Sequence, residues 1–540
     1  MKRLVFALYF FSFLIPAGAQ MPERPKLVVG LVVDQMRWDY LYRYADRYGK
    51  DGFRRLLREG FSCENTFIPY TPTYTAPGHT CIYTGSVPSL HGIISNTWWD
   101  RRTDTTMYCT EDKSVRGVGS NSVWGQMSPR NLWANTITDE LRLATNFRNK
   151  TVAIALKDRG AILPGGHTAN DAFWFDNSTH GWITSTYYGN SLPAWVHAFN
   201  AKALPDAYLK QNWNTLYPIG TYAQSSPDAQ RWEGVMPGGA NTFPHRTDTL
   251  RGDVAMNAFR TSPWGNAYTL EFAKSAIANE RLGKGAFTDF LAVSLSSTDY
   301  IGHTFGPNSI EAEDCFLRLD QQLASFLKYL DEQVGKGNYL LFLTADHGAA
   351  HTPGFAADQK IPSGRVDDRA LQDSLNASVA RAFGFPRVVR SLINYQVYLD
   401  NEAIRRAGAD RVAVKNFVMA ELMRHPGVSK VVDLENLTGA TLPPRIKDMV
   451  INGYNQQRSG DIQFVFRPQW FDWGGNTGTT HGAPYPYDAH IPLVWFGWKQ
   501  KPGRLVREVY MTDIAATLAA LLHIQMPNAS LGKPIEEVVR

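Results

Sequence analysis

The sequence predicts an α/β fold, a three-layer α/β/α sandwich with a mostly parallel central sheet and inserted cap segments. Two observations lead to this class. Short apolar, β-branched segments recur along the 540 residues, and amphipathic helical patterns lie between them. Segments that are apolar throughout are typical of parallel strands covered by helices on both faces.

Five segments have the character of such strands: 27–33, 152–156, 290–295, 339–344 and 491–497. Helices are expected between and after them. Residues 310–333 carry Phe316, Leu319, Leu323 and Leu327 on one helical face. Residues 512–522 begin with a Thr-Asp capping signal.

Two stretches interrupt the alternation of strands and helices. Residues 163–275 are rich in Gly, Pro, Asn, Trp and Tyr, and residues 352–462 mix loops with amphipathic helix, as in 401–423. We interpret both as insertions on a single catalytic domain that spans residues 20–540.

The N-terminus, residues 1–19, is typical of a signal peptide. Lys2 and Arg3 precede an apolar run over residues 4–15, and Ala17-Gly18-Ala19 fits the small-residue rule for cleavage before Gln20. The apolar run is too short to span a bilayer comfortably, and no cysteine follows the cut to carry a lipid. We therefore expect a periplasmic or secreted protein without a membrane anchor.

Charge and cysteine content limit the possible partners. The formal net charge of +5 falls to +3 when Lys2 and Arg3 are removed, and no long run of Lys and Arg suggests a nucleic-acid partner. An even number of cysteines in an exported protein predicts two disulfides, with three pairings open and buried free thiols as the alternative. The four cysteines are Cys63, Cys81, Cys109 and Cys315.

Polar side chains follow several of the predicted strands. Asp34, Lys157, Asp299, Asp346 and His347 each lie at or shortly after a strand's C-terminal end. In open α/β sheets this edge is where ligands bind. Carboxylates and imidazoles are metal ligands, although an aspartate here also serves as a helix cap or a salt-bridge partner.

Spacing strengthens the metal interpretation at two of these positions. Asp299 and His303 are four residues apart in SSTDYIGHTFGP, so one helical turn or a tight loop brings them to one ion. Asp346 and His347 are adjacent at a strand end and are followed by glycine, so the turn can direct both to one site. A capping Asp with an exposed His is the competing interpretation.

A third candidate histidine lies near the C-terminus. His481 occurs in THGAPYPYDAHIP, where Asp488 and His490 are equally plausible ligands by position alone. Position does not choose among these three residues.

Thr75, in PTYTAPGHT, is the candidate nucleophile. Ala-Pro-Gly after it predicts a turn into a helix, whose N-terminus favours a phosphate anion. A threonine hydroxyl reacts only when its alkoxide is stabilised, as a metal ion does. Three aspartates, three histidines and this hydroxyl are enough for two four-coordinate zinc ions that clamp the oxygens of an in-line displacement.

The chain resembles the alkaline phosphatase superfamily, and most closely its phosphate-irrepressible, monomeric bacterial alkaline phosphatases. The resemblance extends from about residue 31 to 497 and rests on VVDQMRWDYL, TPTYTAPGHT, GIISNTWWD, LKDRGAILPGG, SSTDYIGHTFGP, TADHGA and THGAPYPYDAHIP. It implies a monomer that hydrolyses many small phosphate monoesters through a phosphothreonine at Thr75, with two zinc ions per chain. It also selects His481 over His490.

The resemblance divides the ligands between the two ions. Asp34, Asp346 and His347 correspond to the zinc that binds the nucleophile. The zinc that binds the leaving group and later the attacking water corresponds to Asp299, His303 and His481.

Asn96, Lys157 and Arg159 correspond to the residues that hold the phosphoryl oxygens. A monoester is a dianion and needs this charge compensation, whereas diesterases of the superfamily have an apolar pocket there. The sequence therefore favours monoesters. The alternative is that Lys157 and Arg159 are solvated and pair with Asp158 and Asp171.

Three competing functions differ in class or substrate. A nucleotide pyrophosphatase or phosphodiesterase of the same superfamily would share the zinc ligands and the threonine. A sulfatase would need Cys or Ser at position 75 and Arg at position 79, where the chain has Thr75 and His79. A non-catalytic binding protein on a degenerate scaffold would be expected to lack a ligand, and none is missing.

Overall fold

The computed structural model describes residues 23–540, so the predicted signal peptide and its cleavage site lie outside the described residues. Across that range no helix combines the length and the apolar character needed to cross a bilayer.

An 11-stranded sheet occupies the centre of the molecule. Its middle consists of five neighbouring parallel strands, which confirms the predicted mostly parallel sheet. In spatial order these are β10 (Tyr339–Thr344), β1 (Leu27–Val33), β9 (Asp289–Leu295), β6 (Thr151–Ala155) and β7 (Asp171–Asp176).

One edge of the sheet departs from parallel pairing. The predicted segment 491–497 divides into β17 (His490–Ile491) and β18 (Leu493–Gly497), and β18 runs antiparallel to both β10 and β2 (Phe61–Phe67). An apolar run indicates burial on both faces but carries no information on strand direction. The polar pattern of β2, FSCENTF, gave no strand signal at all.

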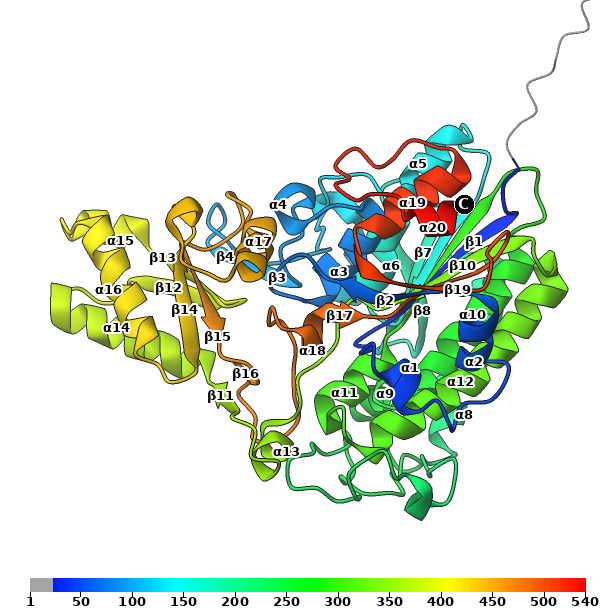
Figure 1. The fold of residues 1–540 in the computed structure, drawn as a ribbon, viewed down its shortest axis with the longest axis horizontal. Coiled ribbons are helices and arrows are strands. Elements are labelled where there is room, and N and C mark those ends of the chain that lie inside the picture. Colours follow the sequence, from blue (N-terminus) through cyan, green and yellow to red (C-terminus); the bar gives the residue numbers. More distant parts are fainter. Residues whose placement is uncertain (1–22) are drawn as a thin grey trace, which may run out of the picture.

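Helices cover both faces of the sheet, which gives the predicted three layers (Figure 1). On one face α10 (Pro263–Asn279) packs against α12 (Ile310–Leu330). On the other, α3 (Thr75–Thr84) packs against α6 (Asp158–Gly165) and α19 (Asp513–Leu522). The predicted helix over 310–333 is thus confirmed, and its last residues continue as a π-helical turn over Asp331–Gly335.

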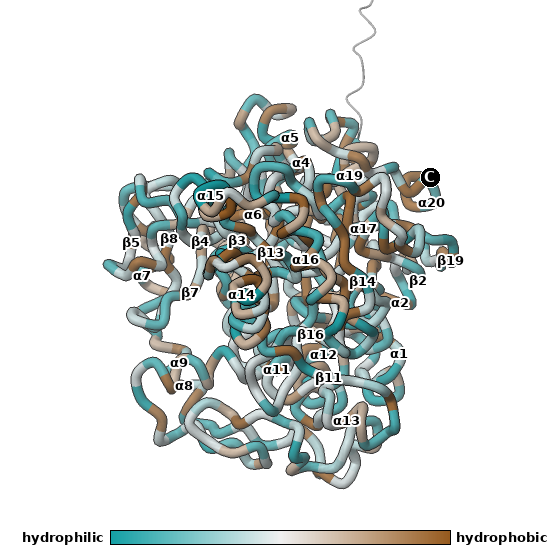
Figure 2. Tube along the Cα trace, turned by 90° about the vertical axis from the view of Figure 1, so that its left-hand side faces the viewer, coloured by the Kyte–Doolittle hydropathy of each residue, from teal (hydrophilic) through white to brown (hydrophobic). Residues whose placement is uncertain are grey.

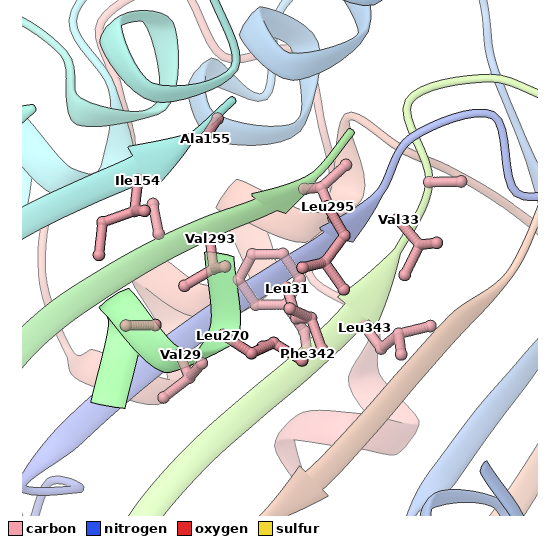
Figure 3. Close-up of a cluster of buried hydrophobic side chains, with 14 of the residues drawn as sticks. Val29, Leu31, Val33, Ile154, Ala155, Leu270, Val293, Leu295, Phe342 and Leu343 are labelled. Atoms are coloured by element: carbon pink, nitrogen blue, oxygen red, sulfur yellow. The ribbon is translucent and has the colours of Figure 1, made fainter. Parts of the chain in front are cut away.

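The core between these layers is aliphatic and aromatic. Leu31 on β1 lies beside Val293 of β9 and Leu343 of β10, and all three are buried (Figure 3). Leu270 of α10 belongs to the same cluster. Burying each such side chain contributes roughly 1.5–3 kcal/mol, so the strand ends that carry the polar residues rest on a rigid sheet.

The two stretches that interrupt the alternation differ in structure. Within 163–275, β7 and β8 (Gly181–Ser185) join the central sheet. Within and just after 352–462, a separate four-stranded sheet packs against α14 (Asp368–Phe383) and α16 (Arg411–Met423) around its own hydrophobic cluster. Its strands are β12 (Val389–Ile393), β13 (Gln396–Leu399), β14 (Val428–Asp433) and β15 (Ile462–Phe466).

This smaller unit projects from one side of the molecule (Figure 1). Seen from that side, α14, α15 (Asn401–Arg406) and α16 lie in front, with hydrophilic and hydrophobic positions alternating along them (Figure 2). That alternation is what helices with one buried face require.

The prediction of two disulfides is wrong. All four cysteines are buried free thiols: Cys63 on β2, Cys81 on α3, Cys109 after β4 (Thr105–Tyr108) and Cys315 on α12. They are distributed over separate elements, and burial raises the pKa of the Cys63 and Cys109 thiols to about 12. The thiols therefore behave as small apolar groups of the core.

Candidate functional site

The polar residues predicted at the strand ends meet at one edge of the sheet. Asp34 directly follows β1, Asp346 lies two residues after β10, and Lys157 caps α6 after β6. Asp299 lies in the first turn of α11 (Ser297–Phe305), which follows β9. Because these four strands are parallel neighbours, their carboxyl ends bring the side chains together.

The first group, which we call the His347 cluster, consists of Asp34, Asp346, His347 and Thr75. His347 Nε2 lies 3.5 Å from Asp34 Oδ1, 3.4 Å from Asp346 Oδ2 and 3.4 Å from Thr75 Oγ1. All four residues are almost completely buried. The structure thus places the candidate nucleophile against the predicted ligands.

Local sequence explains how Thr75 reaches this position. It is the first residue of α3, as the Ala-Pro-Gly pattern predicted. A Cβ on Gly78 would lie 2.6 Å from the Asp346 carbonyl oxygen, so only glycine lets the helix pack this closely. His79 Nδ1 donates to the Thr75 carbonyl at 2.9 Å, and Ser294 Oγ lies 2.8 Å from its Nε2.

The second group, the His481 cluster, consists of Asp299, His303 and His481. Asp299 and His303 lie one turn apart on α11, with His303 Nε2 3.2 Å from Asp299 Oδ1. His481 Nε2 lies 3.7 Å from the same oxygen and comes from a loop. Of the two predicted alternatives, it is a helical turn and not a tight loop that brings Asp299 and His303 together.

All three histidines turn Nδ1 away from the carboxylates and donate it to a backbone carbonyl. The pairs are His347 with Gly348 at 2.9 Å, His303 with Thr479 at 2.8 Å and His481 with Thr73 at 2.7 Å. A carbonyl only accepts, so Nδ1 carries a proton in each ring and Nε2 is the nitrogen that faces the carboxylates. Such orientation by a partner on the second nitrogen is typical of metal-ligating histidines.

Other features of the two clusters fit divalent metal ions. Among residues 23–540, Asp34 Oδ1 and Asp346 Oδ2 are buried atoms without a hydrogen-bond partner. Burial lowers the pKa of His347, and burial together with its two histidine neighbours lowers that of His481, so both rings are neutral donors. Two groups of converging ligand atoms could hold metal, each with its atoms within 4.8 Å of one another: Asp299, His303 and His481 in one, and Asp34, Asp299 and His347 in the other. Asp299 belongs to both groups, so the two clusters meet at this carboxylate.

Lys157 joins the two clusters. Its Nζ donates to Asp34 Oδ2 at 2.7 Å and to Asp299 Oδ2 at 2.5 Å. Burial lowers the pKa of Lys157, but Asp299 and Asp34 outweigh it and raise the value above that of a free lysine. Its side chain is only 2% exposed, so the alternative that Lys157 is a solvated partner of Asp158 and Asp171 is wrong.

Arg159 and Asn96 flank this lysine and the nucleophile. Arg159 Nη1 donates to the Tyr108 hydroxyl at 3.1 Å and forms no ion pair with Asp158 or Asp171 among the described residues. Asn96 Oδ1 accepts from Ala76 N at 2.9 Å, which leaves its amide nitrogen as the donor. Both groups therefore present N–H donors near Thr75 and Lys157.

A family model described as type I phosphodiesterase / nucleotide pyrophosphatase matches residues 28–484. The chain belongs to this family. The matched range of the family model includes both clusters and the three donors Asn96, Lys157 and Arg159.

Several relatives of the family are similar over nearly their whole length. The alkaline phosphatase PhoV of Synechococcus elongatus is 52% identical over 522 residues, 96% of this chain and 94% of that protein. A protein of Myroides odoratus named calcium-transporting ATPase is 52% identical over 534 residues, 98% and 97% of the two chains. The alkaline phosphatase PafA of Elizabethkingia meningoseptica is 49% identical over 520 residues, 96% and 95%.

A solved structure is similar to this chain over nearly its whole length. The crystal structure of PafA superposes with a TM-score of 0.93 and 48% identity, covering 96% of this chain and all of that one. The resemblance to the alkaline phosphatase superfamily, and to its bacterial alkaline phosphatases, is therefore confirmed.

The two alternatives to His481 have other contacts. His490 stacks between Trp38 and Phe67, with ring centroids 4.7 Å from each, and donates to the Glu64 carbonyl. Asp488 accepts from the backbone N–H groups of the two residues after His481, at 3.0 and 2.8 Å, and so shapes the loop.

Sequence reasoning missed Gln35, which contacts both clusters. Its backbone N–H donates to Asp346 Oδ1 at 3.1 Å, and its side-chain Nε2 donates to Asp299 Oδ1 at 2.7 Å. Gln35 adopts φ +64°, an uncommon value for a residue other than glycine. Tyr108 was missed as well, although it orients Arg159.

Proposed function

We propose that the chain is an alkaline phosphatase that hydrolyses phosphate monoesters with broad specificity through a phosphothreonine at Thr75. The observation that carries the proposal is the position of Thr75 Oγ1, 3.4 Å from His347 Nε2 and inside the cluster of Asp34 and Asp346. The names of the relatives PhoV and PafA support the activity. A solved PafA variant replaces one Thr, one Asn, one Lys and one Arg, the residue types proposed here.

We further propose zinc as the metal, with two ions per chain. Asp34, Asp346 and His347 would hold one ion together with Thr75, and Asp299, His303 and His481 would hold the other. Zinc bound there would supply Lewis-acid stabilisation of charge on the attacking and leaving oxygens.

The residues of the chain would carry out the reaction in two displacements. Thr75 Oγ forms a bond to phosphorus as the ester P–O bond breaks, the threonine proton is lost and the alcohol departs. Water then bonds to phosphorus, the bond to Thr75 breaks and inorganic phosphate leaves. Because α3 is fixed by its contact with Asp346, Thr75 needs little reorganisation to attack in line.

Asn96, Lys157 and Arg159 would hold the non-bridging oxygens throughout. The cationic Lys157 and Arg159 match the two charges of a monoester, and the Asn96 amide adds a neutral donor. Preorganised donors aimed at developing charge are worth about 2.7–4 kcal/mol each in related settings.

The test compares turnover of a phosphomonoester and a phosphodiester by zinc-loaded protein, with and without a chelator. We expect the monoester to have the larger kcat/KM, and we expect chelation to abolish both activities and zinc to restore them. About two zinc ions per chain by metal analysis would agree with the ligand assignment. Activity that is indifferent to chelation would contradict it.

A second candidate is a nucleotide pyrophosphatase or phosphodiesterase, which the description of the matching family model favours. It would use the same ligands and the same Thr75. The buried Lys157 argues against it, since a diester substituent gains nothing from this charge. A larger kcat/KM for the diester in the same experiment would establish this candidate instead.

We also propose a monomer in which residues 20–540 form one catalytic domain, with 163–275 and 352–462 inserted, and which is exported after cleavage before Gln20. N-terminal sequencing of the protein recovered from the periplasm or medium tests the cleavage. Light scattering after size-exclusion chromatography tests the monomer.

A further inference from the structure

A cavity of about 590 Å³ opens beside Lys157 and Arg159, and most of its wall has no part in the proposed reaction. Segment 122–124, the end of β7 and the helices α9 (Gly252–Arg260) and α11 complete the wall. Its size is that of a small-molecule site. Trp124, in this wall, is 55% exposed, which also indicates an accessible pocket.

Two arginines line this cavity without carboxylate partners. Among the described residues, neither Arg159 nor Arg260 forms an ion pair, and the Nε of each is buried without a hydrogen-bond acceptor. Lys157 differs, because two carboxylates already accept its hydrogen bonds. A buried N–H donor without a partner costs free energy unless a ligand accepts from it, and the other hydrogen bonds of both arginines go to uncharged oxygens.

Arg260 lies close to the phosphoryl-binding lysine. Its guanidinium carbon is 5.1 Å from the centre of the Tyr300 ring, and Lys157 Nζ is 5.1 Å from the same centre. Because each group lies 5.1 Å from this one point, the guanidinium carbon of Arg260 and Lys157 Nζ are at most about 10 Å apart. Arg260 Nη2 donates to the Asn257 side-chain oxygen at 2.5 Å, and Arg260 Nη1 donates to the Tyr300 hydroxyl at 3.4 Å.

The carboxylates of the cavity wall are mostly engaged by hydroxyl groups. Asp158 accepts from Tyr108 at 2.9 Å and from Thr110. Asp176 accepts from the hydroxyls of Ser120, Ser122, Ser178 and Thr179. Asp253, the third carboxylate, lies in the first turn of α9, whereas Arg260 ends that helix. The positive charges of the two arginines are therefore not paired with these carboxylates, and their Nε donors remain for a ligand.

We propose that Arg260 forms a second anion subsite, which selects phosphate monoesters that carry a second anionic group, a carboxylate or another phosphate. This inference rests on the proposed function, since the first phosphate must be held at Lys157 and Arg159. A small carbon skeleton spans the distance between the two cations, so one substrate reaches both.

The test uses Arg260→Met, which keeps an unbranched aliphatic stem and removes the charged guanidinium group, and two substrates of equal carbon number. Glycerol 3-phosphate carries only the phosphate, whereas 3-phosphoglycerate adds a carboxylate. We expect the ratio of kcat/KM for 3-phosphoglycerate to that for glycerol 3-phosphate to fall about tenfold, as expected for a lost charge-assisted contact. Arg260→Lys should recover part of this ratio.

Arg251→Met is the matched control, because Arg251 precedes the same helix and lies outside the cavity. It should leave the ratio unchanged. An unchanged ratio in Arg260→Met, or an equal loss on both substrates, would overturn the second subsite. Failure of the unmodified, zinc-loaded protein to hydrolyse glycerol 3-phosphate would instead contradict the proposed function, so the two failures are distinguishable.

Discussion

The His347 cluster and the His481 cluster differ in their access to solvent. The side chains of Asp34, Asp346 and His347 are 0% exposed, whereas His303 of the His481 cluster is 25% exposed. The His303 ring faces the Trp473 ring at 5.9 Å with an interplanar angle of 2°. Thr75, the proposed nucleophile, therefore lies in the enclosed half of the site, and solvent reaches the other half at His303.

This difference agrees with the two displacements we propose. Attack by Thr75 benefits from a water-excluded environment, in which electrostatic interactions are stronger. Release of the alcohol and entry of water need an accessible side, which the His481 cluster provides. Substitutions in and around the two clusters test this division.

Thr75→Ala is expected to lower kcat for a monoester by about 10⁴ to 10⁶-fold, since removal of a nucleophile has effects of this size. Bound metal should remain, because three other ligands of the His347 cluster are intact. Steady-state kinetics and metal analysis on the same preparation measure both. Thr75→Ser, which keeps a hydroxyl, should retain far more activity; a Thr75→Ala protein that keeps most of its activity would exclude this nucleophile.

His347→Ala and His303→Ala compare the clusters directly. Each should lose at least about 100-fold in activity, since even indirect partners of ligands are worth 10–100-fold. We expect added imidazole to rescue His303→Ala better than His347→Ala, because only His303 is partly exposed. Equal rescue of both variants would mean that the clusters are equally accessible.

Lys157→Ala and Arg159→Ala should each lower kcat/KM for a monoester by about 10²–10³-fold. The loss for a diester should be smaller, because a diester carries one charge fewer. Parallel kinetics on both substrate types give the ratio. An equal loss on both would show that these residues support the site without selecting its substrate.

Gln35→Ala should have the smallest effect, about 10–100-fold in metal affinity or activity. Its side chain donates to Asp299, whereas its contact with Asp346 is through the backbone and survives the substitution. The affinity of the His481 cluster for its metal should therefore fall more than that of the His347 cluster. Chelator titration followed by metal analysis distinguishes the two. Loss from both clusters alike would contradict this asymmetry.

Much of the fold and of the site could be predicted from the sequence because the signals are local. An apolar strand followed by Asp34 or Asp346 places a carboxylate at the sheet edge whatever the rest of the chain does. The four-residue spacing of Asp299 and His303 is likewise a property of one helix. The positions of these carboxylates and of His303 could therefore be predicted from short segments, whereas the choice of His481 over Asp488 and His490 came from the family resemblance.

Other features depend on contacts between distant segments and gave no local signal. Gln35 matters through φ +64° and through partners more than 260 positions away. Arg260 reaches the cavity from a stretch without strand or motif signals. The antiparallel direction of β18 and the separation of the four thiols also depend on the packing of the whole chain. The disulfide prediction was wrong because it rested on the even number of cysteines in an exported protein and not on their positions in the fold.

Trapping the covalent intermediate tests the proposed role of Thr75 most directly. Zinc-loaded protein is mixed with a monoester, quenched in acid during turnover, digested and examined by mass spectrometry. We expect one phosphoryl group on the peptide that contains Thr75, at Thr75 itself, and none in Thr75→Ala. Phosphate on another residue, or full turnover in Thr75→Ala without any phosphorylated peptide, would contradict this role.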